Sequence, residues 1–305
     1  MTFRPIATQA RFVGLALALA AAAACGGALW QASAHGIGPR TVGWGAAAVA
    51  LAAVALQLAY WTYGQFNLRY ALSRDALVIR WAATRQVIPM AAITHVVKGR
   101  PYLEPLTGPR RLGFEVGHTR VLDDAGEPRP TLVYATVPPD RQVLIMTTGL
   151  AYAISPADAT AFADDFVQRR RLGPRQALEE RTFPAPWARL SVWRDPLALQ
   201  LLGLAGALLA FAFGWLAWHY PELPATVSLR FVHDAAAAAA VPGPGGPKSG
   251  AWRLPTVGLL ALVANLAVAA AAHERGLAVA ARLLLAGAVV VELALGIVLL
   301  RAIAP

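Results

Sequence analysis

The sequence predicts an α-helical integral membrane protein of about five transmembrane helices, with one charged β-rich domain inserted after the second helix. Hydrophobic residues make up 57% of the 305 residues and charged residues only 14%, which is too apolar for two soluble domains. The charges are concentrated between residues 66 and 195, where 18 of the 27 Lys and Arg and 13 of the 17 Asp and Glu lie. One insert and the linker that follows it therefore carry most of the charge.

The net charge of +10 is shared equally between the insert and the rest of the chain. Residues 66–195 have a net charge of +5, and the remaining 9 basic and 4 acidic residues give another +5. This balance favours membrane lipids as partners over nucleic acid, because the flanks are spans and no basic aromatic cluster is present. Cys25 is the only cysteine, so an internal disulfide and Cys-ligated metal centres are excluded within one chain.

The first 65 residues predict a hairpin of two transmembrane helices. Residues 12–30 form an uncharged run of 19 residues, long enough to cross a hydrocarbon core of ~30 Å. Arg4 and Arg11 before this run and the small residues 32–34 leave a cleavable signal peptide as an alternative, although the apolar part is long for one. The second span covers residues 42–63, and its far end carries the interfacial aromatics Tyr60, Trp61 and Tyr63.

From residue 68 onward the hydrophobic period changes to that of short β-strands. The candidate strands are residues 68–73, 76–81, 85–88, 93–97, 131–137, 142–147 and 150–154. Residues 99–130 are rich in Pro, Gly and charge, which predicts a long loop there.

A helix follows the strands and closes the insert. Ser155 is predicted as its N-cap and Pro156 as its first helical residue. Phe162 and Phe166 lie four residues apart, so they share one helix face. Residues 169–171 are three arginines that complement the dipole at the helix end.

These residues carry a resemblance to a known family. The strand Leu77-Val78-Ile79-Arg80-Trp81 and the Val87-Ile88-Pro89 before Ile93 are similar to the bacterial pleckstrin-homology-like (PH-like) domain of membrane proteins. Tyr134-Ala135-Thr136, the segment 138–144 and the entry Tyr152 to Phe162 resemble its later strands and C-terminal helix. The resemblance implies that residues 66–172 form a small, strongly bent antiparallel β-structure capped by a C-terminal helix. It supplies no common catalytic residue or ligand.

The C-terminal part predicts a linker and three more spans. Residues 173–195 contain Pro and Trp beside arginines, which is typical of a juxtamembrane segment. The spans cover residues 197–218, 254–272 and 277–300, within a membrane region of residues 196–305. The loop 219–253 between them, with residues 221–224, 230–231 and 246–249 before Leu254-Pro255, resembles a domain of unknown function in bacterial membrane proteins. Arg230 replaces a histidine of that family, which leaves any inherited role open.

The placement of arginines predicts the orientation in the plasma membrane. With the N-terminus in the cytosol, eight arginines lie near cytosolic ends: Arg4, Arg11, Arg69, Arg74, Arg189, Arg194, Arg275 and Arg282. The inserted domain is then cytosolic, and the loop 219–253 and the C-terminus are external.

The sequence predicts neither an enzyme nor a cofactor. No Gly-x-Ser-x-Gly elbow is present, and no Ser/His/Asp set is suggested by local context. His219 with Glu222, and His233 with Asp234, have spacings compatible with metal ligands, but a site needs three or four convergent groups, so we predict no metal.

Two groups of residues are candidate sites. Glu292 is the one acid within a span, where ionisable groups are candidates for function, and its structural alternative is a hydrogen bond to Asn265 on the neighbouring span. In the cytosolic domain, basic residues are candidates for a lipid-facing surface: Arg74, Arg80, Arg85, Lys98, Arg100, Arg110 and Arg111.

Two classes of function follow. The first is a non-enzymatic recognition or scaffold protein of the membrane, whose domain binds a protein segment, for example at an exposed sheet edge. The second is a small transporter or immunity-type membrane protein that uses the helices and Glu292. The sequence leaves the oligomeric state open.

Overall fold

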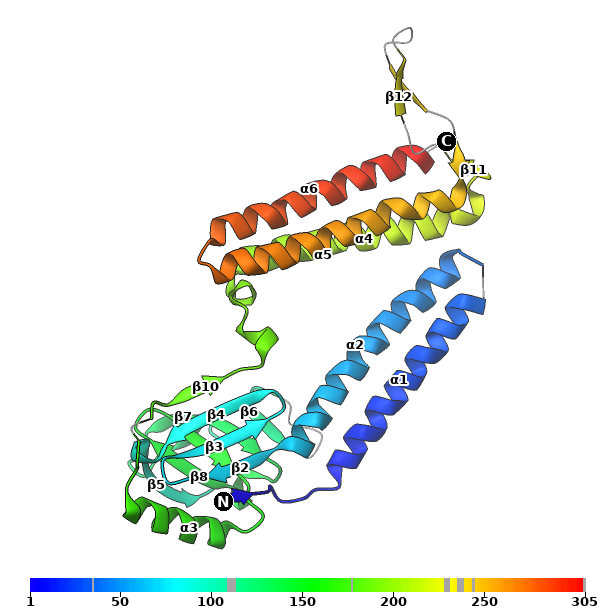
Figure 1. The fold of residues 1–305 in the computed structure, drawn as a ribbon. Helices are drawn as coiled ribbons and strands as arrows, with labels where there is room; N and C mark the ends of the chain where they lie inside the picture. The colour runs from blue at the N-terminus through cyan, green and yellow to red at the C-terminus, as the bar shows by residue number, and fades with distance from the viewer. Residues whose placement is uncertain are drawn as a thin grey trace. The chain divides into compact units, whose positions relative to one another are not determined.

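Five long apolar helices carry the five predicted spans (Figure 1). Their bounds are α1 Ala10–Ala34, α2 Pro39–Asn67, α4 Pro196–His219, α5 Arg253–Glu274 and α6 Ala278–Ile303. Each helix is long and apolar enough to cross a membrane, so the protein belongs to the predicted class. The structure is a computed structural model that describes residues 1–34, 36–108, 114–176, 178–227, 231–234, 239–242 and 245–303.

The chain divides into two units, and each is described by itself. The first unit comprises residues 1–24 and 51–186, and the second comprises residues 25–50 and 187–305. The first unit contains the β-domain together with the halves of α1 and α2 that adjoin it.

Two five-stranded sheets and one helix form the β-domain. One sheet has the order β1-β2-β3-β4-β10 and the other the order β5-β8-β9-β7-β6. The strands are β1 Thr2–Phe3, β2 Arg69–Leu72, β3 Ala76–Trp81, β4 Thr84–Pro89, β5 Ile93–Lys98, β6 Glu115–Leu122, β7 Pro128–Ala135, β8 Val143–Thr147, β9 Ala151–Ile154 and β10 Arg181–Phe183. Helix α3 Ala159–Leu172 follows β9.

The core of the domain lies where the sheets and α3 meet. Tyr70, Ile145 and Phe162 are fully buried there, and Phe3 packs edge-to-face on Phe162 with ring centroids 5.2 Å apart. Phe166 is also buried, which confirms the predicted apolar face of the helix. The helix thus closes the β-structure as the resemblance implied.

The second sheet differs from the prediction in two ways. The predicted loop 99–130 contains all of β6 and the start of β7. Gly117 and the polar residues beside it hide the strand period, yet Gly117 is required there because a Cβ would lie 2.2 Å from the Thr107 carbonyl oxygen. The sheets are also not wholly antiparallel, since β7 and β9 pair in parallel.

The N-cap of α3 is Asp158 and not the predicted Ser155. The Asp158 carboxylate accepts a hydrogen bond of 2.8 Å from the Ala161 amide, as an N-cap does. Ser155 is fully buried at the end of β9, where its hydroxyl accepts from the Thr136 amide at 2.8 Å. Ser155 therefore stabilises the core of the domain, and Asp158 serves as the N-cap of α3.

Two short strands come from outside the predicted interval 66–172. β1 precedes the first span and pairs with β2, while β10 belongs to the linker and pairs with β4. Strands of two and three residues have no readable period, so the sequence did not reveal them. They form the two edge strands of the first sheet.

The end of α2 is fixed to the hairpin of β3 and β4. The Asn67 side chain donates to the Ala82 carbonyl at 2.9 Å and accepts from the Ala82 amide at 2.8 Å. Trp81 lies against Gly64 and packs edge-to-face on Tyr60, with ring centroids 5.7 Å apart. The end of α2 is therefore packed firmly against the first sheet.

Helices α4, α5 and α6 pack side by side in the second unit (Figure 1). Small residues such as Ala205, Ala269 and Ala281 are fully buried between them, which allows close approach of the helices. The connection between α4 and α5 includes the strands β11 Thr226–Val227, β12 Phe231–Asp234, β13 Ala239–Pro242 and β14 Gly246–Pro247.

Candidate functional site

Four arginines lie side by side across the first sheet, and we call them the arginine row: Arg4, Arg69, Arg80 and Arg85. Arg69 is directly opposite Arg80, and Arg80 is directly opposite Arg85. Continuing the β1–β2 register by one residue places Arg4 opposite Arg69. All four are exposed, because the strand alternation sends their neighbours into the core and the arginines to the outer face.

The arginine row lies at the end of the first sheet that adjoins helix α2. Helix α2 ends at Asn67, and β2 begins with Arg69. The exposed Tyr63 is in the last turns of α2, a position typical of the membrane interface. The row therefore directly follows a helix that is long and apolar enough to cross a membrane.

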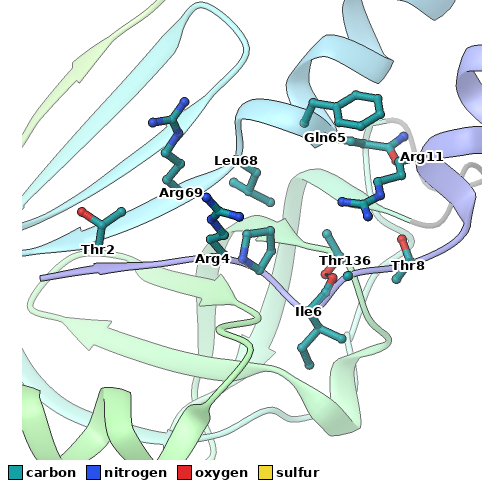
Figure 2. A pocket seen from close by; sticks show the side chains of 12 residues that line it. Thr2, Arg4, Ile6, Thr8, Arg11, Gln65, Leu68, Arg69 and Thr136 are labelled. Atoms are coloured by element: carbon teal, nitrogen blue, oxygen red, sulfur yellow. Dashed lines mark hydrogen bonds between the residues drawn. The ribbon is translucent and has the colours of Figure 1, made fainter.

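A cavity of about 750 Å³ lies beside the row, between the N-terminal segment and the end of α2. Figure 2 shows Arg4 and Arg69 on the side of β1 and Arg11 at the start of α1. We call it the basic cavity. The Arg11 guanidinium lies 4.9 Å from the centroid of Phe12 and 5.7 Å from that of Phe66, and its buried Nε has no hydrogen-bond partner among the described residues.

A second cavity of about 370 Å³ lies along the row itself. It is lined by the ends of α2 and of the β3–β4 hairpin, and by Arg69, Arg80 and Arg85. Arg69 lines both cavities. The guanidinium of Arg85 also lies 5.8 Å from the ring centroid of Phe183 on β10.

The row and Arg11 carry positive charge without a carboxylate. Within the described part of the chain, no ion pair involves Arg4, Arg11 or the other members of the row, whereas Arg129 and Arg169 have acids at 2.8 Å. Like charges directly opposite on neighbouring strands are destabilising. An anion that binds between these guanidinium groups would remove this cost.

Among the predicted basic residues that the structure describes, it brings together only Arg80 and Arg85. Arg74 instead donates to the carbonyl oxygens of Leu172 and Gly173 at the end of α3. Arg74 is thus a C-terminal cap of this helix.

The other predicted basic residues are not part of the row. Arg100 donates to the Leu122 carbonyl at 3.0 Å and pairs with Asp124. Lys98 is on β5 in the other sheet, and Arg110 and Arg111 lie outside the described residues.

Sequence reasoning missed Arg4, Arg11 and Arg69 as site residues. The sequence indicated these arginines as determinants of membrane orientation, and Arg4 and Arg11 also as features of the alternative signal peptide, although each lies within a few residues of a span. The position of Arg69 directly after α2 was the available signal. The contribution of Arg4 depends on β1, which the sequence did not reveal.

Glu292 is buried in the second unit without the predicted partner. It is 2% exposed, and its Oε1 has no hydrogen-bond partner in the described residues. Asn265 instead donates to the Ala261 carbonyl of its own helix at 2.9 Å, so the predicted pair is wrong. The room for the carboxylate comes from Gly258, where a Cβ would lie 2.5 Å from Oε2.

A polar cluster joins the ends of α4, α5 and α6, which the sequence did not predict. Ser191 Oγ is 2.8 Å from His273 Nδ1, and His273 Nε2 is 3.3 Å from Asp195 Oδ2. These residue types form hydrolase triads, but Ser191 also bonds the Glu274 carboxylate at 2.8 Å, which opposes an oxyanion. Asp195 caps α4 and accepts a hydrogen bond from Arg282 at 2.8 Å. The cluster therefore stabilises the contact between the ends of α4, α5 and α6.

The histidines considered as metal ligands have other surroundings. His219 Nδ1 is 3.0 Å from the Trp215 carbonyl oxygen, and its ring centroid is 4.1 Å from that of Trp215. The side chains of His233 and Asp234 lie outside the described residues. Among the residues described, no three potential metal ligands gather.

Comparison with known proteins identifies the inserted domain. Residues 68–170 match the family model of the bacterial PH domain, so the chain carries a bacterial PH domain within a membrane protein. No curated protein and no solved structure matches the chain. The matched segment ends before residue 219, and the resemblance drawn for the loop 219–253 stays a prediction.

Proposed function

We propose that the protein is a non-enzymatic recognition protein of its membrane, whose PH domain binds the phosphate group of an anionic lipid in the basic cavity. One observation carries this proposal: arginines without an ion pair in the described chain meet around a cavity directly beside the end of a span. Arg4, Arg11 and Arg69 supply the binding groups.

The chemistry of guanidinium groups suits this ligand. Arginine binds phosphate with two parallel hydrogen bonds and is the preferred residue for such recognition. Lipid phosphates are the anions present at headgroup level, and each basic residue near an anionic surface contributes ~1 kcal/mol. The stacking of Arg11 on Phe12 and Phe66 orients its guanidinium before a ligand arrives.

The tether decides what such binding can do. The PH domain is attached to α2 before it and to the linker and α4 after it, so it does not need a lipid to reach the membrane. Lipid binding then reports the composition of the surrounding membrane or positions the domain for a partner. We propose a sensing or scaffold role.

The test compares lipid binding by the full chain and by two matched triple variants. Arg4→Ala/Arg11→Ala/Arg69→Ala removes the cavity arginines, and Arg141→Ala/Arg171→Ala/Arg175→Ala removes three exposed arginines elsewhere. Each protein is reconstituted in nanodiscs of phosphatidylcholine with phosphatidylglycerol, and the retained lipids are identified by native mass spectrometry.

We expect the cavity variant to lose ~3 kcal/mol of anionic-lipid binding, a reduction of roughly 100-fold. The control variant should retain most of its phosphatidylglycerol. Equal lipid retention by the two variants would contradict the proposal, because it would show that only net charge matters.

The orientation is part of the proposal. Eight arginines near the predicted cytosolic ends support a PH domain in the cytosol and an external C-terminus. A reporter fused after residue 305 should be inactive if it works only in the cytosol. Activity of that reporter would refute this topology.

A protein partner of the domain stays a second part of the recognition proposal. The edge strands of the first sheet are β1 and β10, which have only two and three residues and so offer few backbone groups to an added strand. In the second sheet, the backbone of Leu103 and Thr107 already bonds to β6 at Arg120 and His118. The edge at β5 is therefore the position we propose for strand addition. Affinity capture with and without the domain tests this.

Buried Glu292 favours the second function class, a small transporter. A carboxylate oxygen at 2% exposure with no hydrogen-bond partner among the described residues is costly within a membrane helix, and such residues are candidates for function. Glu292→Gln should then abolish transport, while the variant still binds lipid in the basic cavity. Unchanged transport by this variant would leave recognition as the function.

A further inference from the structure

We infer that the lipid bound by this protein carries two phosphate groups, one in the basic cavity and one over the arginine row. The inference rests on the proposed function and adds the class of lipid. It depends on the second cavity, on the alignment of the row and on the number of arginines that have no ion pair in the described part of the chain.

The alignment of the row makes a second anion position. Arg69, Arg80 and Arg85 are on three adjacent strands in direct register, and neighbouring strands are about 4.8 Å apart. Their side chains leave the same face of the sheet, so the three charges are held within roughly 10 Å. A phosphate placed between them can accept from two or three guanidinium groups.

The second cavity leaves room for this phosphate. Its other lining residues at the β3–β4 turn, Ala82, Ala83 and Thr84, are small. The Asn67 side chain makes two hydrogen bonds to the Ala82 backbone. It therefore stabilises the wall of this cavity and does not bind the ligand. Phe183 lies against the Arg85 guanidinium and restricts its orientation.

Arg69 connects the two positions. It lines both the basic cavity and the second cavity, so a headgroup that enters one is adjacent to the other. One phosphodiester carries a single negative charge, whereas the row and Arg11 together present five arginines. A headgroup with two phosphates matches this arrangement better than a single phosphate does.

The experiment compares two anionic lipids at equal phosphate content. The full chain is reconstituted in phosphatidylcholine nanodiscs that contain either phosphatidylglycerol, with one phosphate, or cardiolipin, with two. Native mass spectrometry of graded lipid mixtures gives the affinity ratio between the two lipids.

Three variants localise the preference: Arg80→Ala/Arg85→Ala on the row, Arg4→Ala/Arg11→Ala in the basic cavity, and Arg141→Ala/Arg175→Ala as the charge-matched control. Far-UV circular dichroism establishes that each variant is folded. We expect the wild type and the control to prefer cardiolipin by roughly tenfold. The row variant should lose this preference and still bind phosphatidylglycerol.

The outcomes separate this inference from the proposed function. If the row variant keeps the full preference for cardiolipin, or if the wild type shows none, the second phosphate position is wrong while the basic cavity can still hold one phosphate. If the cavity variant binds both lipids as the wild type does, the proposed function itself fails, and this inference fails with it.

Discussion

The contact between Gly64 and Trp81 predicts how firmly span α2 is joined to the PH domain. A Cβ at Gly64 would lie 2.6 Å from Trp81 Nε1 and 2.7 Å from Cε2. Ordinary van der Waals contact begins at 3.4 Å, so Gly64→Ala must push the indole away by about 0.8 Å. The indole cannot move freely, because it packs on Tyr60 and on the core of the domain.

The magnitude follows from two opposing effects. Overpacking of this kind costs ~1–3 kcal/mol, while alanine in place of glycine within a helix gains ~1 kcal/mol. Gly45→Ala, in the same helix with no atom within 4 Å of the added Cβ, gains only the helix contribution. The difference in free energy of unfolding between the two variants should therefore be ~1–3 kcal/mol.

Urea unfolding of the full chain in detergent, followed by circular dichroism, measures this difference. We expect Gly64→Ala to unfold at a lower urea concentration than Gly45→Ala. Adding Trp81→Leu should remove most of the penalty of Gly64→Ala, since the clashing ring is gone. Identical urea unfolding of the two glycine variants would refute this reasoning, because it would show that the Trp81 ring can move away from Gly64 without cost.

Four further predictions, at three residues, concern stability. Tyr70→Phe leaves the Tyr134 carbonyl, now bonded at 2.7 Å, without its donor and should cost ~1–3 kcal/mol in urea unfolding. Burial raises the pKa of Tyr70 to about 12, so wild-type stability should fall as pH rises from ~10 through 12, and a flat alkaline profile would contradict this. Phe162→Ala should cost ~3–5 kcal/mol by thermal unfolding, and a loss below 1 kcal/mol would mean that α3 does not close the core. The hydrogen bond from Arg282 lowers the pKa of Asp195 to about 2. The stabilisation that Asp195 contributes should therefore be present above pH ~4 and lost toward pH 2. Asp195→Asn, which keeps a cap on α4, should abolish this acid dependence in a pH titration of the melting temperature.

The spans were predictable because length and apolarity alone define them. Uncharged runs of about 20 residues have no soluble alternative, and the five helices confirm this reasoning. The strands β2 to β5 and the Phe162/Phe166 face were also predictable, since their periods are uninterrupted. β6 was not, because Gly117 and its polar neighbours break the period.

The arginine row could not be predicted from the sequence, for a different reason. Its alignment requires the register of four strands, and β1 is only two residues long. The β3–β4 hairpin turns at Ala82 and Ala83, with Ala82 at a φ of 48°, where a turn signal such as Asn or Gly is expected. Without that signal, nothing in the sequence places Arg80 opposite Arg85.

The pairing of β1 with β2 has a consequence for the synthesis of the chain. β1 leaves the ribosome before either span, and its partner strand follows only after α1 and α2 are complete. Folding of the sheet must therefore wait for insertion of the helical hairpin, and the loop that closes when β1 docks is the hairpin itself. Docking requires both ends of the hairpin on one side of the bilayer, so a molecule with a single inserted span cannot complete this sheet.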